Sequence, residues 1–402
     1  MHKTHYKLLV CLMVFLCLII IPTSFAADAD SLDENIISDN SLDLVESVDY
    51  DDSLESLNIE EEILDGGESK DGLLEAHYYF NSSAENDGIG TMGNPYKYFN
   101  KTIKDNSVIH LANGVYELGS SYYNTNITII GQDASQTILK GRLFEIKENV
   151  ILQNITLDNV KINNRGKLNA TNVIFCNGYR YDYYGGAIYT PISNGSVYLR
   201  NCSFYNNSAT KSGGAIYSES DIEVIDCVFI NNSADVGGAI YSKGANVKIT
   251  DSKAINNSAN SFGGAFTFLK SDVKVINLYG FNNTAKYDGG LIYQIYGNLT
   301  ISNSNFISNN AKNGAGIFVA STKRLTISND NFTNNSANAS AGAIYSILNN
   351  NTDMRNIIYE NNTASDPIFN DLYNFSSIDL IISDNDYAMY IYNKSDKPLP
   401  SS

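Results

Sequence analysis

Short segments in which apolar and polar residues alternate recur along the chain between residues 222 and 327. In the first of them Ile222 and Val224 share one side of the backbone, and Glu223 falls on the other. The same alternation recurs at Val247 and Ile249, Val273 and Val275, Leu299 and Ile301, and Leu325 and Ile327. A period of two residues indicates β-strands, so we expect these apolar side chains to face a common core.

A longer repeat encloses these segments. Blocks related to Gly-Gly-Ala-Ile-Tyr begin at Gly185, Gly213, Gly237, Gly263, Gly289, Gly314 and Ala341, with successive spacings of 28, 24, 26, 26, 25 and 27 residues. A second block, related to Asn-Asn-Ser-Ala, begins at Asn206, Asn231, Asn256, Asn282, Asn309, Asn334 and Asn361. Such a regular period is typical of a protein built from stacked repeats.

Each alternating segment ends at an asparagine or aspartate, residues that tolerate a left-handed backbone and can bond neighbouring amides. These positions form a predicted turn ladder: Asn201, Asp226, Asp251, Asn277, Asn303 and Asn329. The glycine pairs and the Asn-Asn-Ser-Ala blocks mark two further turns. Because no hairpin signal separates the copies, we expect equivalent strands to pair in parallel, one period apart. The predicted fold is all-β: a right-handed parallel β-helix (β-solenoid) with about 26 residues per coil.

The chain is expected to divide around this repeat. Residues 76–145 contain short β-branched strands and are assigned to an N-terminal cap and the first coils. Residues 146–365 are assigned to the repeat β-helix, and residues 366–402 to a C-terminal cap and tail.

The N-terminus has the pattern of an export signal. Residues 1–26 combine a basic start, an apolar run and small residues before a cleavage site between Ala26 and Ala27. No later apolar run is long enough to span a bilayer. We therefore expect an extracellular or cell-surface protein with no integral membrane span after cleavage.

The formal net charge of −17 is concentrated in residues 27–75, which hold 18 acidic residues and one lysine. This segment is predicted to be an acidic, disordered leader. Lys3 and Lys7 precede it, so residues 76–402 carry about −2. A nearly neutral body gives no basis for nucleic-acid binding, which requires clustered lysine and arginine.

Three cysteines remain after the signal: Cys176, Cys202 and Cys227. Their odd number and the lack of a Cys-x-x-Cys spacing argue against a disulfide framework and a zinc site. We predict buried apolar cysteines, no metal and no cofactor.

The Gly-Gly-Ala-Ile-Tyr blocks, each followed by a phenylalanine and paired asparagines, resemble the repeats of chlamydial polymorphic outer-membrane proteins. The layout of signal, acidic leader, an entry segment ("GNPYKYFNKTIKDNSVIHLANGVY") and Asn-rich coils is similar to adhesin-like proteins of methanogenic archaea. The resemblance covers roughly residues 88–365. It implies a pectin-lyase-like right-handed β-helix, and a non-catalytic protein that attaches to glycans or proteins of other cells.

A column of tyrosines is the candidate binding face. Tyr189, Tyr217, Tyr241, Tyr293 and Tyr345 each follow an isoleucine of the repeat, with Thr267 and Phe318 at the same position in the other copies. If the isoleucines face the core, the tyrosines face outward and could stack on a ligand. The alternative is stacking between coils that only stabilises the fold. The loop of residues 177–186 adds Tyr179, Tyr181, Tyr183 and Tyr184.

Other functions stay open at this point. The β-helix could carry a polysaccharide lyase or hydrolase, although His77 and His110, the histidines that follow the signal, both precede the repeats. It could also be a purely structural surface rod. Asp226 and Asp251 are expected one coil apart, where they either hold a cation or remain solvated. The many Asn-x-Ser/Thr sequons are possible sites of glycosylation.

Overall fold

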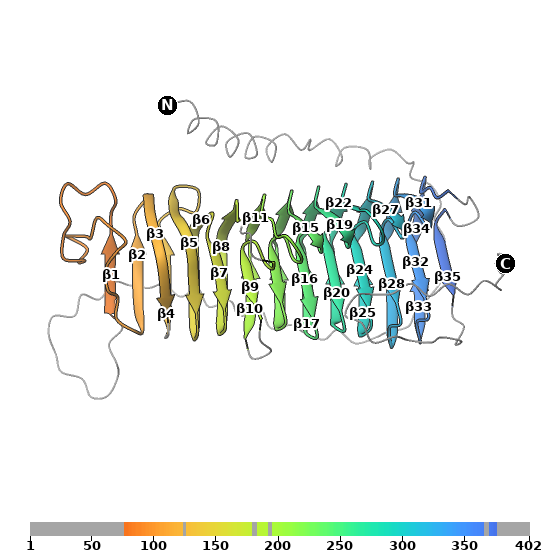
Figure 1. Ribbon diagram of the computed structural model, residues 1–402, viewed down its shortest axis with the longest axis horizontal. Helices are drawn as coiled ribbons and strands as arrows, with labels where there is room; N and C mark the ends of the chain where they lie inside the picture. The colour runs from red at the N-terminus through yellow and green to blue at the C-terminus, as the bar shows by residue number, and fades with distance from the viewer. Residues whose placement is uncertain (1–75, 124–125, 179–182, 192–194, 366–369, 376–402) are drawn as a thin grey trace, which may run out of the picture. The chain divides into compact units, whose positions relative to one another are not determined.

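The computed structural model describes residues 76–123, 126–178, 183–191, 195–365 and 370–375. The predicted signal peptide with its cleavage site, the acidic leader and the end of the tail lie outside these residues. All regular structure in the described residues is β-strand, and the named strands pair in parallel to form stacked coils (Figure 1). The predicted all-β solenoid is thus confirmed. The same residues contain no helix long and apolar enough to cross a membrane.

The first side of the coils, face A, follows the alternating segments of the sequence. Its strands are β1 (Ala76–Phe80), β2 (Ser107–Leu111), β4 (Ile127–Gly131), β6 (Asn149–Asp158), β8 (Lys167–Cys176), β10 (Ser196–Arg200), β13 (Asp221–Ile225), β17 (Asn246–Thr250), β21 (Asp272–Ile276), β25 (Asn298–Ser302), β29 (Arg324–Ser328) and β33 (Thr352–Arg355). Long strands β6 and β8 continue past the corner onto the second side, face B, where β8 also pairs with β11.

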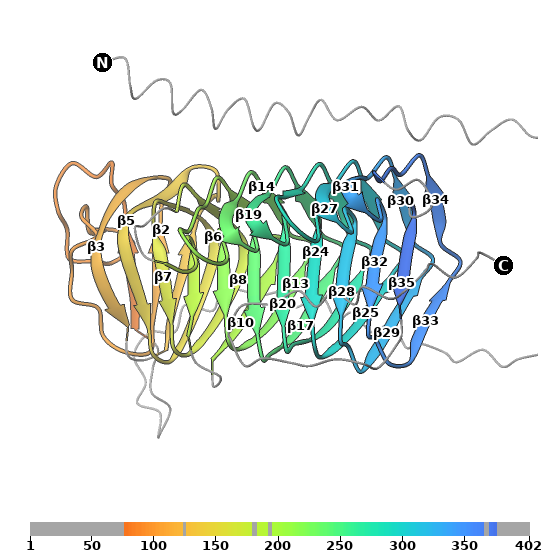
Figure 2. The same ribbon diagram turned by 45° about the vertical axis from the view of Figure 1, so that its right-hand side comes forward.

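Face B is made of short strands that follow the turn ladder. They are β11 (Ser203–Tyr205), β14 (Val228–Ile230), β18 (Lys253–Ile255), β22 (Tyr279–Phe281), β26 (Asn305–Ile307), β30 (Asn331–Thr333) and β34 (Ile358–Glu360). A separate five-stranded sheet follows it: β15 (Ser233–Val236), β19 (Ser258–Phe262), β23 (Thr284–Ala285), β27 (Asn310–Asn313) and β31 (Ser336–Ser340). Figure 2 shows this short sheet next to the face B strands.

The third side, face C, carries the isoleucine and tyrosine positions of the repeat. Its strands are β7 (Lys161–Asn164), β9 (Ile188–Thr190), β12 (Ile216–Ser218), β16 (Ile240–Lys243), β20 (Phe266–Leu269), β24 (Ile292–Ile295), β28 (Ile317–Ala320), β32 (Ile344–Ile347) and β35 (Leu372–Phe375). The second halves of the long strands β3 (Gly114–Tyr123) and β5 (Thr137–Ile146) also lie on face C, and their first halves lie on face B, where β5 pairs with β6.

The strand register gives the length of each coil. From Val197 onward, partners on face A lie 25 to 27 residues apart, as in the pairs Val197 with Ile222 and Val247 with Val273. This agrees with the predicted period of about 26 residues. The earlier coils differ: partners are 20, 23 and 18 residues apart at β2–β4, β4–β6 and β6–β8.

The core is filled by the inward positions of the three faces. The inward residues predicted from the alternating segments, of which Ile222 is the first and Ile327 the last, are each at most 4% exposed. Phenylalanines on face B stack from coil to coil, with ring centroids 4.6 Å apart for Phe175 and Phe204 and 4.8 Å apart for Phe204 and Phe229. Cys176, Cys202 and Cys227 are buried and form no disulfide, as predicted. Because truncating a buried phenylalanine costs about 3–5 kcal/mol, this stack contributes strongly to stability.

The corners use the left-handed backbone that the asparagines permit. The six residues of the turn ladder have φ between 50° and 58°. At the glycine corner, Gly213 has φ 67°, and a Cβ there would lie 2.1 Å from the carbonyl oxygen of Ile216. A side chain at this glycine would therefore collide with the next strand of its own coil.

A second asparagine ladder, which the sequence analysis did not separate from the turn, runs inside the coils. It consists of Asn207, Asn232, Asn257, Asn283, Asn309, Asn335 and Asn362. In each pair of neighbours, the backbone N and Nδ2 of one asparagine both donate to Oδ1 of the next, at 2.9–3.1 Å. Each Nδ2 also donates to a backbone carbonyl, for example Asn257 to Phe229 O at 3.0 Å.

This ladder corrects one boundary of the repeat. Asn309 was expected to begin its Asn-Asn-Ser-Ala block, but it occupies the buried second position. Ser308, with φ 55°, takes the exposed corner that Asn282 and Asn334 take in neighbouring coils. The block is therefore shifted by one residue in this coil, and serine replaces asparagine at the corner.

Candidate functional site

The tyrosine column lies outside the core, as the alternation requires. The isoleucines before it, Ile188, Ile216, Ile240, Ile292, Ile317 and Ile344, are 0% exposed. The tyrosine rings stack on one another between coils. Ring centroids are 5.2 Å apart for the stacked pair Tyr217 and Tyr241 and 5.1 Å apart for the stacked pair Phe318 and Tyr345, whereas Tyr189 and Tyr217 are tilted at 5.4 Å.

The column is much less exposed than the sequence led us to expect. Tyr217 is 7% exposed and Tyr293 is 5% exposed, and Tyr189, Tyr241 and Tyr345 are half-buried. Tyr217 is covered by the rings of the coils before and after it, Tyr189 and Tyr241, because the coil spacing is close to the separation of stacked aromatic rings. The Tyr217 hydroxyl donates to Glu219 Oε1 at 2.6 Å, and burial raises the pKa of Tyr217 above its usual range.

Thr267 interrupts the column, and the last residue of β19, Phe262, fills the gap. The Thr267 hydroxyl donates to the carbonyl of Phe262 at 3.1 Å. The Phe262 ring stacks on Tyr293 with centroids 4.8 Å apart and belongs to the same apolar cluster. A ring thus stands over Tyr293 although the repeat position itself holds a threonine.

The exposed aromatic surface is at the start of the column. Tyr183 is 58% exposed, and Lys211 Nζ lies 4.4 Å from the centre of its ring. Tyr184 stacks on Tyr189, and Lys161 Nζ lies 5.0 Å from the Tyr189 ring. We call these residues, Tyr183, Tyr184, Tyr189, Lys161 and Lys211, the aromatic patch. Tyr179 and Tyr181 lie outside the described residues.

The turn ladder is exposed and joined by side-chain hydrogen bonds. Asn277 Nδ2 donates to Asp251 Oδ1 at 2.6 Å, and Asn356 Nδ2 donates to Asn329 Oδ1 at 3.0 Å. One oxygen of Asp251 therefore has an amide partner in the next coil. Among the described residues, no three His, Cys, Asp or Glu side chains gather as they would around a metal ion.

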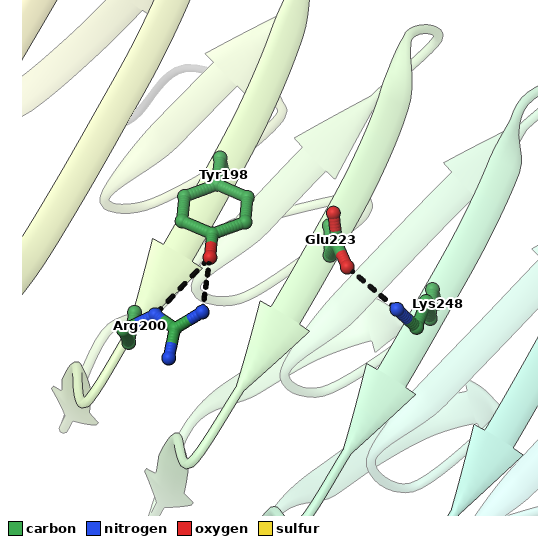
Figure 3. A network of polar contacts seen from close by, with 4 residues as sticks. All are labelled: Tyr198, Arg200, Glu223 and Lys248. Carbon is green, nitrogen blue, oxygen red and sulfur yellow. Dashed lines mark hydrogen bonds and ion pairs between the residues drawn. The ribbon is translucent and has the colours of Figure 1, made fainter. Parts of the chain in front are cut away.

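Face A carries a hollow that the sequence analysis missed. Its volume is about 550 Å³, and outward side chains of β10, β13, β17, β21 and β25 line it. Tyr198, Glu223 and Lys248 are adjacent members of one outward column (Figure 3). Lys248 Nζ pairs with Glu223 Oε1 at 2.8 Å. Next to them, Arg200 donates to the Tyr198 hydroxyl from Nε at 3.1 Å and from Nη2 at 2.7 Å.

A second outward column borders the same hollow. Asp221 Oδ1 accepts a hydrogen bond from the backbone N of Asn246 at 2.8 Å, and Asp272 Oδ1 accepts one from that of Asn298 at 2.9 Å. The polar positions of the alternating segments are the signal that could have identified these side chains. Since each lies about 25 residues from its neighbour in the column, only the register brings them together.

Two coils of this chain match a known repeat. Residues 201–219 and 226–243 match the Chlamydia polymorphic membrane protein (Chlamydia_PMP) repeat, so the chain is similar to that family over these segments. No curated protein matches the chain.

Solved structures with a similar chain path include an epimerase module, a polysaccharide lyase and a catalytic domain. The Azotobacter vinelandii mannuronan C-5 epimerase AlgE4 A-module is 11% identical, with 75% of this chain and 100% of that chain covered and a TM-score of 0.26. A mannuronic acid specific polysaccharide family 6 lyase from human gut microbiota is 9% identical, with 70% and 83% covered and a TM-score of 0.25. The Agl-KA catalytic domain is 13% identical, with 63% and 62% covered and a TM-score of 0.24. TM-scores this low carry no argument about the activity of this chain.

Proposed function

We propose that this protein is an extracellular, adhesin-like β-helix that binds glycans or proteins of other cells and performs no catalysis. The observation that supports this function best is the aromatic patch, where the exposed Tyr183 and Lys211 lie beside tyrosine rings that the buried Lys161 contacts. Large exposed aromatic side chains with polar neighbours are typical of binding surfaces. The similarity to the Chlamydia polymorphic membrane protein repeat agrees with a surface location.

The patch can bind without disturbing the fold. The neighbouring rings of Tyr184 and Tyr217 contact each other in a tilted arrangement, with centroids 4.7 Å apart, so the surface around Tyr183 is preorganised. A rigid aromatic surface loses little conformational entropy on binding. Tyrosine is also among the residues that most often dominate binding energy.

The test is binding of the full chain to a glycan array and to intact cells, with Tyr183→Ser as the variant. We expect the variant to keep the melting temperature of the parent and to bind at least fivefold more weakly. The matched control is Tyr279→Ser, which removes another exposed tyrosine, 36% exposed, from β22 on face B. Equal losses in the two variants, or no loss in either, would count against the aromatic patch.

The non-catalytic part of the proposal has its own assay. The purified chain is incubated with polygalacturonate and polymannuronate, with and without calcium, and products are followed by ultraviolet absorbance and reducing-end titration. We expect no unsaturated or reducing ends above the no-protein background. Their accumulation in proportion to protein concentration would make the chain a polysaccharide-degrading enzyme.

A further inference from the structure

The hollow on face A continues into a second one. The second hollow, about 440 Å³ in volume, lies at the corner between faces C and A and is lined by Lys270, Tyr296 and Lys323, among others. Asn246 and Asp272 line both hollows. The two therefore form one depression, which we call the face A groove.

Four lysines line the face A groove. Lys248 and Lys274 lie directly opposite each other on β17 and β21, and Lys270 and Lys323 lie at the corner. Like charges opposite each other on neighbouring strands repel. Of these four exposed lysines, Lys248 alone has an ion pair in the part of the chain that the structure describes, with Glu223. An anionic ligand would relieve this repulsion.

Two residues of the groove hold an uncommon backbone conformation. Lys270 has φ 54° and Tyr296 has φ 60° at a corner that is left-handed in each coil, held by Gly244 in the coil before Lys270 and by Ser321 and Leu348, both with φ 55°, in the two coils after Tyr296. Long side chains rarely adopt a left-handed backbone, and glycine or asparagine would hold this corner at a lower free-energy cost. Strained residues of this kind concentrate at binding sites, where the side chain matters more than the strain.

The carboxylates of the groove restrict the kind of anion. Asp221 accepts hydrogen bonds from Asn246 at both carboxylate oxygens, and Asp272 accepts from Asn298 at Oδ1. A carboxylate can accept about four hydrogen bonds. A polyanion without hydroxyl donors, such as DNA, would be repelled by them. A sugar chain can donate hydroxyl protons to the aspartates and place its acidic groups at the lysines.

We infer that the face A groove binds a linear acidic glycan, which runs along the stacked coils and carries carboxylate or sulfate groups. Successive coils are about 4.8 Å apart, which is close to the advance of one sugar unit in an extended glycan. Lys248, Lys274, Lys270 and Lys323 then hold the acidic groups, and the Tyr296 ring contacts a sugar face. This inference rests on the proposed binding function but uses a different surface from the aromatic patch.

The experiment measures binding of polygalacturonate, dextran sulfate and neutral dextran to the full chain by titration calorimetry at low and high salt. The variant is Lys270→Asn with Lys274→Gln. Asparagine suits the left-handed corner, so we expect the variant to melt at or above the parent temperature. We expect it to bind the acidic polymer at least tenfold more weakly, and parent binding to weaken as salt rises. The control is Lys253→Gln, which removes an exposed lysine of β18 on face B.

The outcomes separate this groove from the proposed function. The groove is supported if the double variant loses binding of an acidic polymer and Lys253→Gln keeps it. The polymer that binds more tightly then shows whether the groove prefers carboxylate or sulfate groups. Equal binding by parent and double variant, or binding of dextran as tight as that of the acidic polymers, overturns it. If the parent binds cells but neither acidic polymer, the groove inference fails while the adhesin function stands. Loss of cell binding in Tyr183→Ser alone leaves the groove result unaffected.

Discussion

The first coils and the repeat coils share three faces, but they differ by one insertion. From Val150 to Leu168 the coil takes 18 residues, and from Val197 to Ile222 it takes 25. In the short coil the chain passes from the corner residue Asn159 to face C within a few residues, at β7. In the repeat coils the buried asparagine, the short sheet and the glycine pair lie between these points.

This difference shows which features the fold requires. The described residues before 178 contain neither the paired glycines nor the buried asparagine ladder. Three faces and an apolar core are therefore enough to form these coils. The ladder is an addition that satisfies polar groups inside a wider coil. The repeat region therefore depends on buried hydrogen bonds in a way that the first coils do not.

The largest expected effect comes from breaking the ladder with Asn257→Ala. The change removes the acceptor of two donors of Asn232 and leaves the Phe229 carbonyl without its Asn257 donor. Each buried unsatisfied group costs about 1–3 kcal/mol, so we expect a loss of about 3–6 kcal/mol in the free energy of unfolding. Hydrogen exchange should rise in β14, β18 and β22 and stay unchanged in β2 and β4.

The control for this variant is Asn277→Ala in the exposed turn ladder. It removes one exposed hydrogen bond to Asp251 and should cost about 1 kcal/mol. If chemical denaturation gives the same loss for both variants, the buried ladder has no special role.

The next effect concerns a carboxyl group inside the repeat region. Asp330 is 0% exposed, its Oδ2 has no hydrogen-bond partner among the residues that the structure describes, and burial raises its pKa to about 7 from the usual 3.8. The folded state favours the protonated form of Asp330. The contribution of this carboxyl to the free energy of unfolding is therefore full below pH 3.8 and is lost as pH rises through about 7. This shift corresponds to about 4 kcal/mol.

Asp330→Ser should remove this pH dependence, because serine occupies the same position at Ser304 in the preceding coil. We expect the variant to gain up to about 4 kcal/mol over the parent at pH 8 and little at pH 4. Urea denaturation at both pH values measures this. Asp353→Ser, which alters an exposed aspartate, is the control, and an equal gain there would contradict the assignment.

A smaller effect is expected for Tyr217→Ser. Tyr217 is nearly buried between the rings of Tyr189 and Tyr241, so the change should cost about 2–4 kcal/mol. Tyr183→Ser, at an exposed position, should leave the melting temperature unchanged. A Tyr217 variant as stable as the parent would mean that the column does not stabilise the fold.

The smallest effect concerns His110 in the first coils, whose contribution to stability changes with pH in the opposite direction to that of Asp330. Burial, and secondly the charge of His77, lower the pKa of His110 below its usual 6.5. The contribution of His110 is therefore present above pH 6.5 and is lost as pH falls below it. We expect exchange of β1 and β2 amides, corrected for intrinsic rates, to rise at pH 5, and His110→Ile to prevent this. Ile130 already occupies the next position of that column.

The sequence predicted the features that local chemistry determines. Strand phase followed from the alternation at Ile222 and Val224, and the corners followed from residues such as Asn277 that accept a left-handed backbone. The burial of Asn257 could not be separated from a turn, because its partners Asn232 and Asn283 belong to other coils.

The site was less predictable because its parts come from different coils and loops. The exposure of the tyrosine column depends on neighbours such as Phe262, which no repeat position would assign to the stack. The face A groove depends on a register that places Lys248 beside Lys274 and on a corner shared with Tyr296. Each of these residues is unremarkable in its own segment of sequence.

The buried asparagine ladder also bears on how such a chain can change in length. Each asparagine of the ladder accepts through Oδ1 from the coil before and donates through its backbone N and Nδ2 to the coil after. The last of them, Asn362, donates to Asp371 Oδ1 at 3.1 Å. Any coil that carries the ladder can therefore follow any other. A tandem gene duplication of one 25- or 26-residue unit would add a coil whose ladder bonds match those of its neighbours, so the length of the repeat region can vary in evolution.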